Sequence, residues 1–243
     1  GSKRQPGSTF KILAAYAPAL DSCDKTLATT IDDEPYTLKN GQVLRNANKQ
    51  YGGTTTLREG IKRSINVVAV KLSDEITQEL GYEYCQKFGI STLVKNKTIN
   101  GKVFDDSTSQ TLALGGITEG VYNYEMCAAY ATIANGGEYN KPTLYSKVVD
   151  HDGNVLLDGT GESHTVLKDS TAYLLTSAME DVVNSGTGTA CQLPNMLVPQ
   201  LPTRTYGSVD LHHITPVPYG EDMTTTRNVI MTQVSVSDSG KVS

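Results

Sequence analysis

Ser8 and Lys11 lie three residues apart in the run RQPGSTFKILAAYAPAL near the amino terminus. A proline-glycine turn leads directly into an amphipathic helix, an arrangement that presents a serine hydroxyl at the start of the helix. At helical spacing the amine of Lys11 lies on the same face as the Ser8 hydroxyl, and it can accept the serine proton if burial lowers its pKa. The pattern predicts a serine nucleophile with a lysine as its proton acceptor.

A Ser-x-x-Lys pattern is weak evidence by itself. The chain contains a second copy, Ser22 and Lys25, in the polar stretch DSCDKT. We expect both of these groups to be solvated, and chance explains their spacing.

Ser64 and Asn66 form a second candidate motif, a Ser-x-Asn triplet inside an apolar helical pattern. A hydroxyl and a carboxamide at i and i+2 both point inward only if the local chain is a turn. In that case Ser64 is predicted to relay a proton between Lys11 and a leaving amine, and Asn66 to donate to a substrate amide carbonyl. The alternative is a serine that caps the following helix, which the triplet taken alone favours because Ser and Asn are preferred capping residues.

The elements that must position these residues follow from the spacing of apolar side chains and from turn residues. A loop or short hairpin is expected before Thr54, a hairpin over 143–157 that turns at HDGN, and loop from about 91 to 110. Several helices combined with short hairpins predict an α+β fold with helices around an antiparallel sheet, or an α/β sandwich whose sheet is incompletely represented. The predicted helices cover 9–20, 57–76 with the triplet as an interruption, a segment ending at Gly89, 122–137 and 171–183.

Composition narrows the function classes. The 243 residues suffice for one sizeable domain or two small ones, and a formal net charge of −5 without a long basic block gives little support to a nucleic-acid surface. No apolar run approaches the roughly 18 to 20 residues that span a bilayer. Four widely separated cysteines and the adjacent pair His212 and His213 lack the spacing of metal ligands, so no metal or organic cofactor is implied.

The two motifs together with their flanking stretches resemble the transpeptidase domain of penicillin-binding proteins. The resemblance covers roughly Lys3 to Val198 and is greatest to the class A, bifunctional cell-wall synthases. Ser-x-x-Lys followed by a Ser-x-Asn-type triplet is the signature of such acyl-serine enzymes. The matching stretches are RQPGSTFK, LREGIKRSINVVAVKL, ALGG, AAYATIANGG, KVVDHDGNVL and VVNSGTG.

The resemblance implies the chemistry. Ser8 would attack the penultimate D-alanine carbonyl of a peptidoglycan stem peptide, the amine of a neighbouring stem would resolve the acyl-enzyme, and β-lactams would acylate the same serine. Lys11 would accept the proton, Ser64 would relay it and Asn66 would bind substrate. The implied fold is the α/β sandwich of serine acyltransferases and β-lactamases. The implied location is the extracytoplasmic face of the bacterial cell membrane, with a membrane-anchored parent protein.

One expected motif is missing. A Lys-Thr-Gly triplet should follow VVNSGTG, where it would bind the substrate carboxylate and contribute an amide to the oxyanion hole. Thr187-Gly188 is preceded by glycine, and Ser239-Gly240-Lys241 has the wrong order. We therefore expect impaired activity, since loss of one oxyanion donor can cost on the order of 100- to 1000-fold in rate.

The composition changes after Val198, where neither helical nor strand periodicity continues. Back-translation of Gln200 to Asn228, read one nucleotide out of step with suitable codons, yields TTNKDLWFCGFTPYYTCTIWGGYDNN, which resembles the family segment that follows Lys-Thr-Gly. The chain has no tryptophan, whereas the shifted frame contains two. We interpret this as a deletion near Pro199 that removed the triplet and shifted the frame of everything after it.

Residues 1–198 are therefore predicted to form an N-terminally truncated transpeptidase domain, and 199–243 an aberrant tail. A sheet that lacks strands at both chain ends exposes edges and apolar faces, which predicts poor solubility or marginal stability. One alternative is a catalytically inactive remnant that at most binds peptidoglycan or β-lactam. Another is a serine β-lactamase, which ranks last because the insert between Asn66 and Gly186 resembles the synthase pattern.

Overall fold

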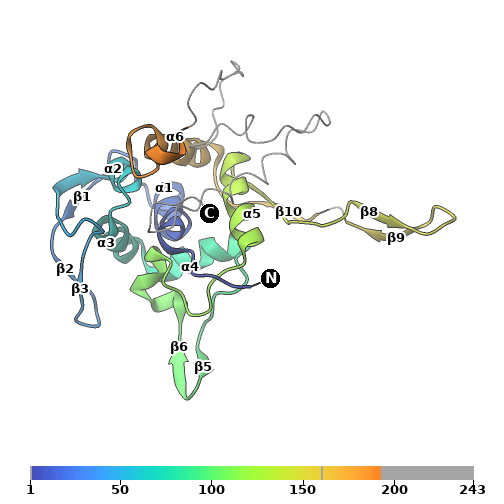
Figure 1. Cartoon of the computed structure of the whole chain (residues 1–243), viewed down its shortest axis with the longest axis horizontal. Helices are drawn as coiled ribbons and strands as arrows, with labels where there is room; N and C mark the ends of the chain where they lie inside the picture. Colours follow the sequence, from blue (N-terminus) through green and yellow to red (C-terminus); the bar gives the residue numbers. More distant parts are fainter. Residues whose placement is uncertain (1, 160, 193–243) are drawn as a thin grey trace.

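The computed structural model describes residues 2–159 and 161–192. The chain enters the centre of the molecule as a continuous helical run (Figure 1): η1 (Gly7–Thr9), a π-helical turn η2 (Ile12–Tyr16) and α1 (Ala17–Ser22). All side chains from Phe10 to Leu20 are buried, Lys11 included, so the expected amphipathic character of this helix is wrong: it has no solvated face. The helix predicted over 9–20 is confirmed, with a π-helical turn at its centre that the sequence did not indicate.

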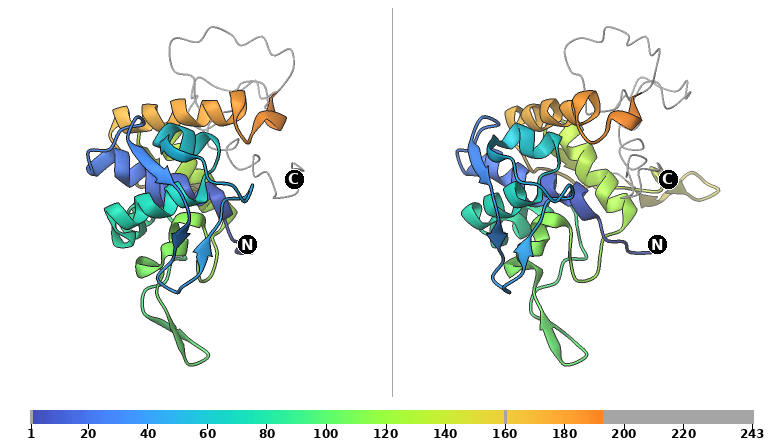
Figure 2. Two further views of the ribbon diagram at one scale, coloured as in Figure 1. Left: turned by 90° about the vertical axis from the view of Figure 1, so that its left-hand side faces the viewer. Right: turned by 60° about the vertical axis from the view of Figure 1, so that its left-hand side comes forward.

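The other helices surround this central run, and α6 lies across one side of it (Figure 2). Thr56 caps α2 by accepting a hydrogen bond from the Glu59 backbone, and Gly89 follows the end of α4 at a φ of 84°. The helices predicted from apolar spacing are confirmed, including the break at the Ser-x-Asn triplet. They are α2 (Leu57–Lys62), α3 (Asn66–Ile76), α4 (Gln78–Lys87), α5 (Asn123–Ala134) and α6 (Asp169–Ser185), with short 3-10 turns η3 (Asp106–Thr108), η4 (Gln110–Leu114) and η5 (Thr189–Cys191).

The strands form antiparallel pairs. The short hairpin before Thr54 and the hairpin that turns at HDGN are both confirmed. The pairs are β1 (Thr30–Asp33) with β4 (Gly53–Thr56), β2 (Tyr36–Thr37) with β3 (Val43–Leu44), β5 (Lys97–Ile99) with β6 (Lys102–Phe104), β7 (Glu138–Asn140) with β10 (Ser163–Thr165), and β8 (Lys147–Val149) with β9 (Val155–Asp158).

The β5–β6 hairpin corrects the prediction of a loop from 91 to 110. Its turn is Asn100-Gly101, with φ values of 50° and 76°. Both central residues of a type I′ turn require positive φ, which is why Asn-Gly is the preferred pair there. The Asn100-Gly101 pair is the sequence signal for this hairpin.

In the described part of the chain every sheet has two strands, so the larger antiparallel sheet of the expected sandwich is not assembled there. The mixed helix-and-strand class is confirmed. The β5–β6 and β8–β9 hairpins project from the body (Figure 1), and the latter exposes Val155, Leu156 and Leu157. Within 2–159 and 161–192, no helix has the length and apolar character needed to cross a bilayer. The predicted tail, 199–243, lies outside the described residues.

Candidate active site

Lys11 is the centre of the candidate site. It belongs to the buried central helical run, and its side chain is only 2 % exposed. Its Nζ donates hydrogen bonds to the Ser64 carbonyl oxygen at 2.7 Å, to Ser64 Oγ at 3.0 Å and to Asn66 Oδ1 at 2.7 Å. Two motifs more than fifty residues apart in sequence therefore meet at one amine.

Burial determines the protonation of this amine. Removal from water penalises the ammonium form and lowers the pKa of Lys11 from 10.5 to about 7. None of the described Asp or Glu side chains forms an ion pair with Lys11 that would counter this effect. A large fraction of Lys11 is therefore a neutral amine near pH 7, with a lone pair that can accept a proton.

The Ser-x-Asn triplet forms the turn between α2 and α3. Ser64 N donates to the Ile61 carbonyl at 3.0 Å, and Ile65 N donates to the Gly60 carbonyl at 2.9 Å. Ser64 has a φ of 52°, a left-handed conformation that is uncommon for residues other than glycine and that persists only where its surroundings hold it. The N-cap residue of α3 is Ile65, with no side-chain capping bond. The alternative of a capping serine is therefore wrong.

Ser8 lies in η1, one turn before Lys11, and is exposed. Its side chain makes no hydrogen bond within the described part of the chain. The backbone around it is fixed, because Thr9 Oγ1 donates to the Pro6 carbonyl at 2.7 Å and Tyr130 Oη of α5 donates to the Thr9 carbonyl at 2.7 Å. The hydroxyl is thus presented to solvent from a braced turn.

The stretch ALGG packs directly beneath this turn. Gly115 has a φ of 70°, and a Cβ added there would lie 2.2 Å from the Gly7 carbonyl oxygen and 2.6 Å from the Gly7 nitrogen. Next to it, Gln5 Nε2 donates to the Ile117 carbonyl at 2.7 Å, and Ile117 N donates back to Gln5 Oε1 at 3.1 Å. The sequence indicated this stretch only through the family resemblance; the structure gives its physical role, the support of the Ser8 turn.

Gly115→Ala is expected to destabilise the domain by about 2 to 4 kcal/mol, because it combines backbone strain at positive φ with a backbone collision. It should also slow any reaction of Ser8, since Gly7 must move. Gly101→Ala is the matched control: its φ is 76° but no atom lies within 4 Å of the added Cβ, so only the strain of about 1 kcal/mol remains. Urea denaturation of both variants measures the difference, and equal losses of stability would contradict the packing argument.

The glycine-rich stretch VVNSGTG lies against the end of α2. Thr187 N donates to the Lys62 carbonyl at 3.2 Å, and a Cβ on Gly186 would lie 2.3 Å from the same oxygen. Lys62 precedes Ser64 by two residues. This loop is therefore a further support of the candidate site, one that the apolar spacing of the sequence could not have indicated.

The second Ser-x-x-Lys pair is not assembled as a site. Ser22 Oγ donates to the Pro18 carbonyl at 3.0 Å, whereas Lys25 Nζ forms an ion pair with Glu75 at 2.7 Å. The expectation that this copy is a chance occurrence agrees with that geometry. Residues 2–159 and 161–192 contain no group of three His, Cys, Asp or Glu side chains that could hold a metal ion; His212 and His213 lie outside the described residues.

Solved structures with the same fold are transpeptidase domains of penicillin-binding proteins. The D,D-transpeptidase domain of a peptidoglycan glycosyltransferase from Eggerthella lenta matches with a TM-score of 0.63 and 25% identity, over 81% of this chain and 52% of that one. The penicillin-binding protein PonA1 from Mycobacterium tuberculosis, in a complex with penicillin V, matches with a TM-score of 0.63 and 26% identity, over 75% of this chain and 48% of that one. The fold, with Lys11 held by Ser64 and Asn66, thus defines a transpeptidase-type domain.

Curated relatives agree. Penicillin-binding protein 1A of Clostridium botulinum is 35% identical over 204 residues, which are 80% of this chain and 24% of the relative. Penicillin-binding protein 1A/1B of Bacillus subtilis is 29% identical over 81% of this chain and 20% of the relative. The profile of the penicillin binding protein transpeptidase domain matches residues 2–202. The chain belongs to this family, and it spans about a quarter of the length of the curated relatives it matches.

Proposed function

We propose that this chain is a D,D-transpeptidase domain in which Ser8 forms an acyl-enzyme with a peptidoglycan stem peptide and is acylated by β-lactams in the same way. The observation that carries the proposal is the buried Lys11 amine, held by Ser64 and Asn66 one helical turn from an exposed serine. Membership in the family supports it. We further propose that the domain acts at the extracytoplasmic face of a bacterial membrane, since its relatives are bacterial penicillin-binding proteins.

The hydrogen bonds around Lys11 suit a proton acceptor. A neutral amine retains two N–H groups, which suffice for the Ser64 carbonyl and for Asn66 Oδ1. The third position of the neutral nitrogen is its lone pair, which faces Ser64 Oγ at 3.0 Å, so a proton can reach Lys11 directly from Ser8 or through the Ser64 hydroxyl. As Ser8 Oγ attacks the carbonyl carbon, its proton passes to Lys11; as the C–N bond breaks, a proton passes to the leaving amine.

Ser64 is the candidate relay for that second transfer. Its hydroxyl lies 3.0 Å from Lys11 Nζ and can both accept a proton from the ammonium and donate its own. The strained backbone of Ser64 places both its carbonyl and its hydroxyl on Lys11. A relay through Ser64 therefore requires no side-chain movement toward the lysine.

Asn66 is the candidate substrate-binding residue. Its Oδ1 accepts from Lys11, and its Nδ2 donates to the Arg45 carbonyl at 2.9 Å. A carboxamide nitrogen carries two hydrogens, so one remains for a substrate amide carbonyl. The opposite orientation of the carboxamide is excluded, because it would place Oδ1 against the Arg45 carbonyl oxygen, where neither atom carries a hydrogen.

The rate of β-lactam acylation is expected to rise with pH through about 7 and to level off above it. The folded-state pKa of Lys11 is lowered to about 7 by burial, so the neutral form that accepts the Ser8 proton is depleted below that value and dominates above it. Single-turnover acylation by a penicillin between pH 5.5 and 9, corrected for hydrolysis of the drug in buffer, measures this. A rate that stays constant or falls from pH 6 to 8 would contradict the role of Lys11.

A time course of intact mass separates the alternatives. A transpeptidase-type site gives a penicilloyl adduct that persists after free drug is removed. A β-lactamase gives an adduct that is lost rapidly while drug is hydrolysed in excess over protein. A chain that circular dichroism shows to be folded, yet that forms no adduct, is the inactive remnant, and the proposal is then wrong.

A further inference from the structure

Asn46 caps the helix that carries the candidate substrate-binding residue, although it lies about twenty residues earlier in the sequence. Its Oδ1 accepts hydrogen bonds from the backbone of Asn66 at 3.0 Å and of Val67 at 3.2 Å. These are the first two residues of α3. The N-cap residue itself, Ile65, has no side chain that could accept them, so Asn46 satisfies N–H groups that would otherwise be unpaired at the helix start.

The orientation of the Asn46 carboxamide is fixed from the opposite side. Its Nδ2 donates to Asp33 Oδ1 at 2.7 Å and to the Gln50 carbonyl at 2.8 Å. The other Asp33 oxygen accepts from the Gly52 backbone at 2.8 Å. Asn46 and Asp33 are both buried, at 8% and 3% exposure, and each of their four side-chain polar atoms has a partner. The carboxamide therefore has one orientation, with its acceptor toward α3.

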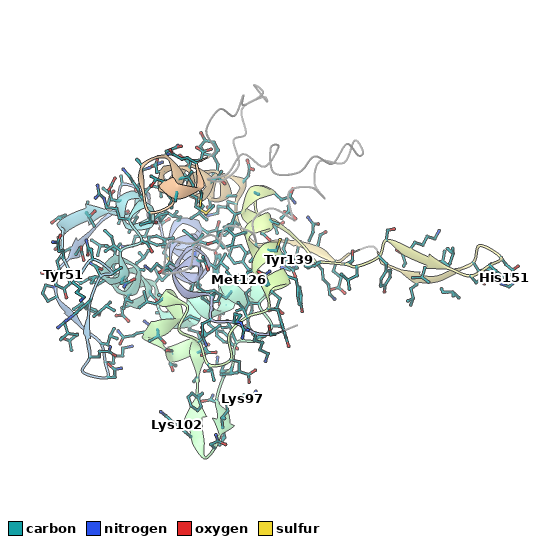
Figure 3. All side chains as sticks on the ribbon, in the orientation of Figure 1. Tyr51, Lys97, Lys102, Met126, Tyr139 and His151 are labelled. Carbon is teal, nitrogen blue, oxygen red and sulfur yellow. The ribbon has the colours of Figure 1, made fainter. Side chains whose placement is uncertain are left out.

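The loop that carries Asn46 also holds the side chain of Asn66. The Arg45 carbonyl accepts a hydrogen bond from Asn66 Nδ2, and Asn66 Oδ1 accepts one from Lys11 Nζ. The loop is braced internally, because Tyr51 Oη donates to the Leu44 carbonyl at 2.8 Å and Lys49 N donates to the Asn46 carbonyl at 2.9 Å. Figure 3 shows Tyr51 at the side of the molecule opposite the β8–β9 hairpin tip, where His151 lies.

We propose that Asn46, oriented by Asp33, is a positioning residue for the acylation site: it fixes the first turn of α3 and thereby the Asn66 carboxamide against Lys11. It touches neither the serine nor the substrate. The inference rests on the proposed function, since acylation is the reaction whose rate Asn46 would set. Its physical basis is a continuous chain of hydrogen bonds from Asp33 through Asn46 and Asn66 to the amine.

Loss of this contact has a predictable effect on the site. With two unpaired N–H groups, the first turn of α3 frays and the Asn66 side chain loses its fixed place. A displacement of about 1 Å at a reacting group can cost on the order of 100-fold in rate, so a reduction of about 10- to 100-fold is expected for Asn46→Ala. Water that enters beside Lys11 rehydrates its ammonium and moves its titration upward by about one pH unit.

Two designed variants and one control test this proposal. Asn46→Ala removes both contacts. The double variant Asn46→Asp with Asp33→Asn exchanges the two groups: a carboxylate then accepts from the α3 backbone, where negative charge is favourable, and the carboxamide donates to it while still accepting from Gly52. The bond to the Gln50 carbonyl is replaced by a contact between two acceptor oxygens, a cost that the exchanged pair carries and Asn46→Ala does not. Asn48→Ala is the control in the same loop; Asn48 is exposed, and its Oδ1 accepts only from the Gln50 backbone.

Two readouts are taken on each variant that circular dichroism shows to be folded. The first is the rate of acylation by a fluorescent penicillin as a function of pH. The second is the titration of the Lys11 side chain, followed by NMR of protein with ¹³Cε-labelled lysine and assigned with Lys11→Arg. The Lys11 titration can be measured without acylation. A wild-type chain that forms no adduct therefore refutes the proposed function, and the position of Asn46 is then tested by the titration of Lys11 only.

The inference predicts slower acylation and a shifted Lys11 titration in Asn46→Ala. In the exchanged pair the acylation rate should return to within about threefold of wild type and the Lys11 titration to within about 0.3 pH unit. Asn48→Ala should give wild-type values of both. A folded Asn46→Ala with wild-type rate and titration would overturn it. Where Asn46→Ala does not fold, the exchanged pair decides: recovery of both readouts supports the proposal. If the exchanged pair also fails to fold, Asn46 serves the stability of the fold and the proposal is wrong.

Discussion

Lys11→Met should slow β-lactam acylation by about 100- to 10,000-fold, the range that a positioned general base contributes. Methionine retains the length and the apolar packing of the lysine stem in a site that is almost fully buried. It cannot accept the Ser8 proton or donate to Asn66 Oδ1. Because burial of an ammonium opposes folding, we expect the variant to remain folded. Single-turnover acylation at pH 8, where wild-type Lys11 is mostly neutral, gives the comparison.

Lys25→Met is the matched control for this prediction. It removes the lysine of the second Ser-x-x-Lys copy, whose amine pairs with Glu75. A partly exposed ion pair of this kind contributes about 1 kcal/mol or less, so acylation should be unchanged. Equal rates in Lys11→Met and wild type would show that another group accepts the serine proton.

Restoring a Lys-Thr-Gly segment should raise the acylation rate about 100- to 1000-fold. The family resemblance assigns to that triplet a cationic anchor for the substrate carboxylate and one amide of the oxyanion hole, and one lost oxyanion donor costs this much in rate. The chain to test carries the triplet near Pro199, followed by residues 200–228 in the alternative frame. The control is the same chain with the lysine of the triplet replaced by alanine. Rates within threefold of the original chain would contradict the expectation.

The nucleotide sequence across this junction tests the frame shift itself. Two bases of each shifted codon are dictated by the residue present in this chain and one is free. Codons that spell the restored segment, with tryptophan at the overlaps with Gly207 and Gly220, would support a deletion. Codons that cannot encode the restored segment would refute the deletion. The family match to residues 2–202 is compatible with both outcomes, so the shift stays a prediction.

Local patterns were sufficient for the helices, and they singled out the residues that the structure brings together at Lys11, which are Ser64 and Asn66. Apolar side chains at three- and four-residue spacing determine α3 and α6, and Ser64 interrupts that spacing where the structure has its turn. The contact of Lys11 with Ser64 was expected from their side-chain types, which suit one proton relay, and from the family resemblance of the two motifs. The lowered pKa of Lys11 was only a condition of the sequence-based hypothesis, and the structure supplies its cause, the burial of the amine.

Contacts between distant segments could not be predicted in this way. Nothing in the local sequence around Asn46 indicates that its side chain caps α3, because the loop 45–52 has the composition of an ordinary turn. The contact of Gly115 with Gly7 likewise depends on how η4 packs against η1. Such contacts are set by tertiary packing, and they are the ones that fix the positions of Ser8 and Asn66.

The most direct test of the account is the intact mass of the chain after incubation with a penicillin, measured beside Ser8→Ala. Covalent acylation requires the nucleophile, the proton acceptor and the fold at once. The account predicts one penicilloyl adduct per chain, absent in Ser8→Ala. No adduct on a folded wild-type chain, or an adduct that persists in Ser8→Ala, would contradict it.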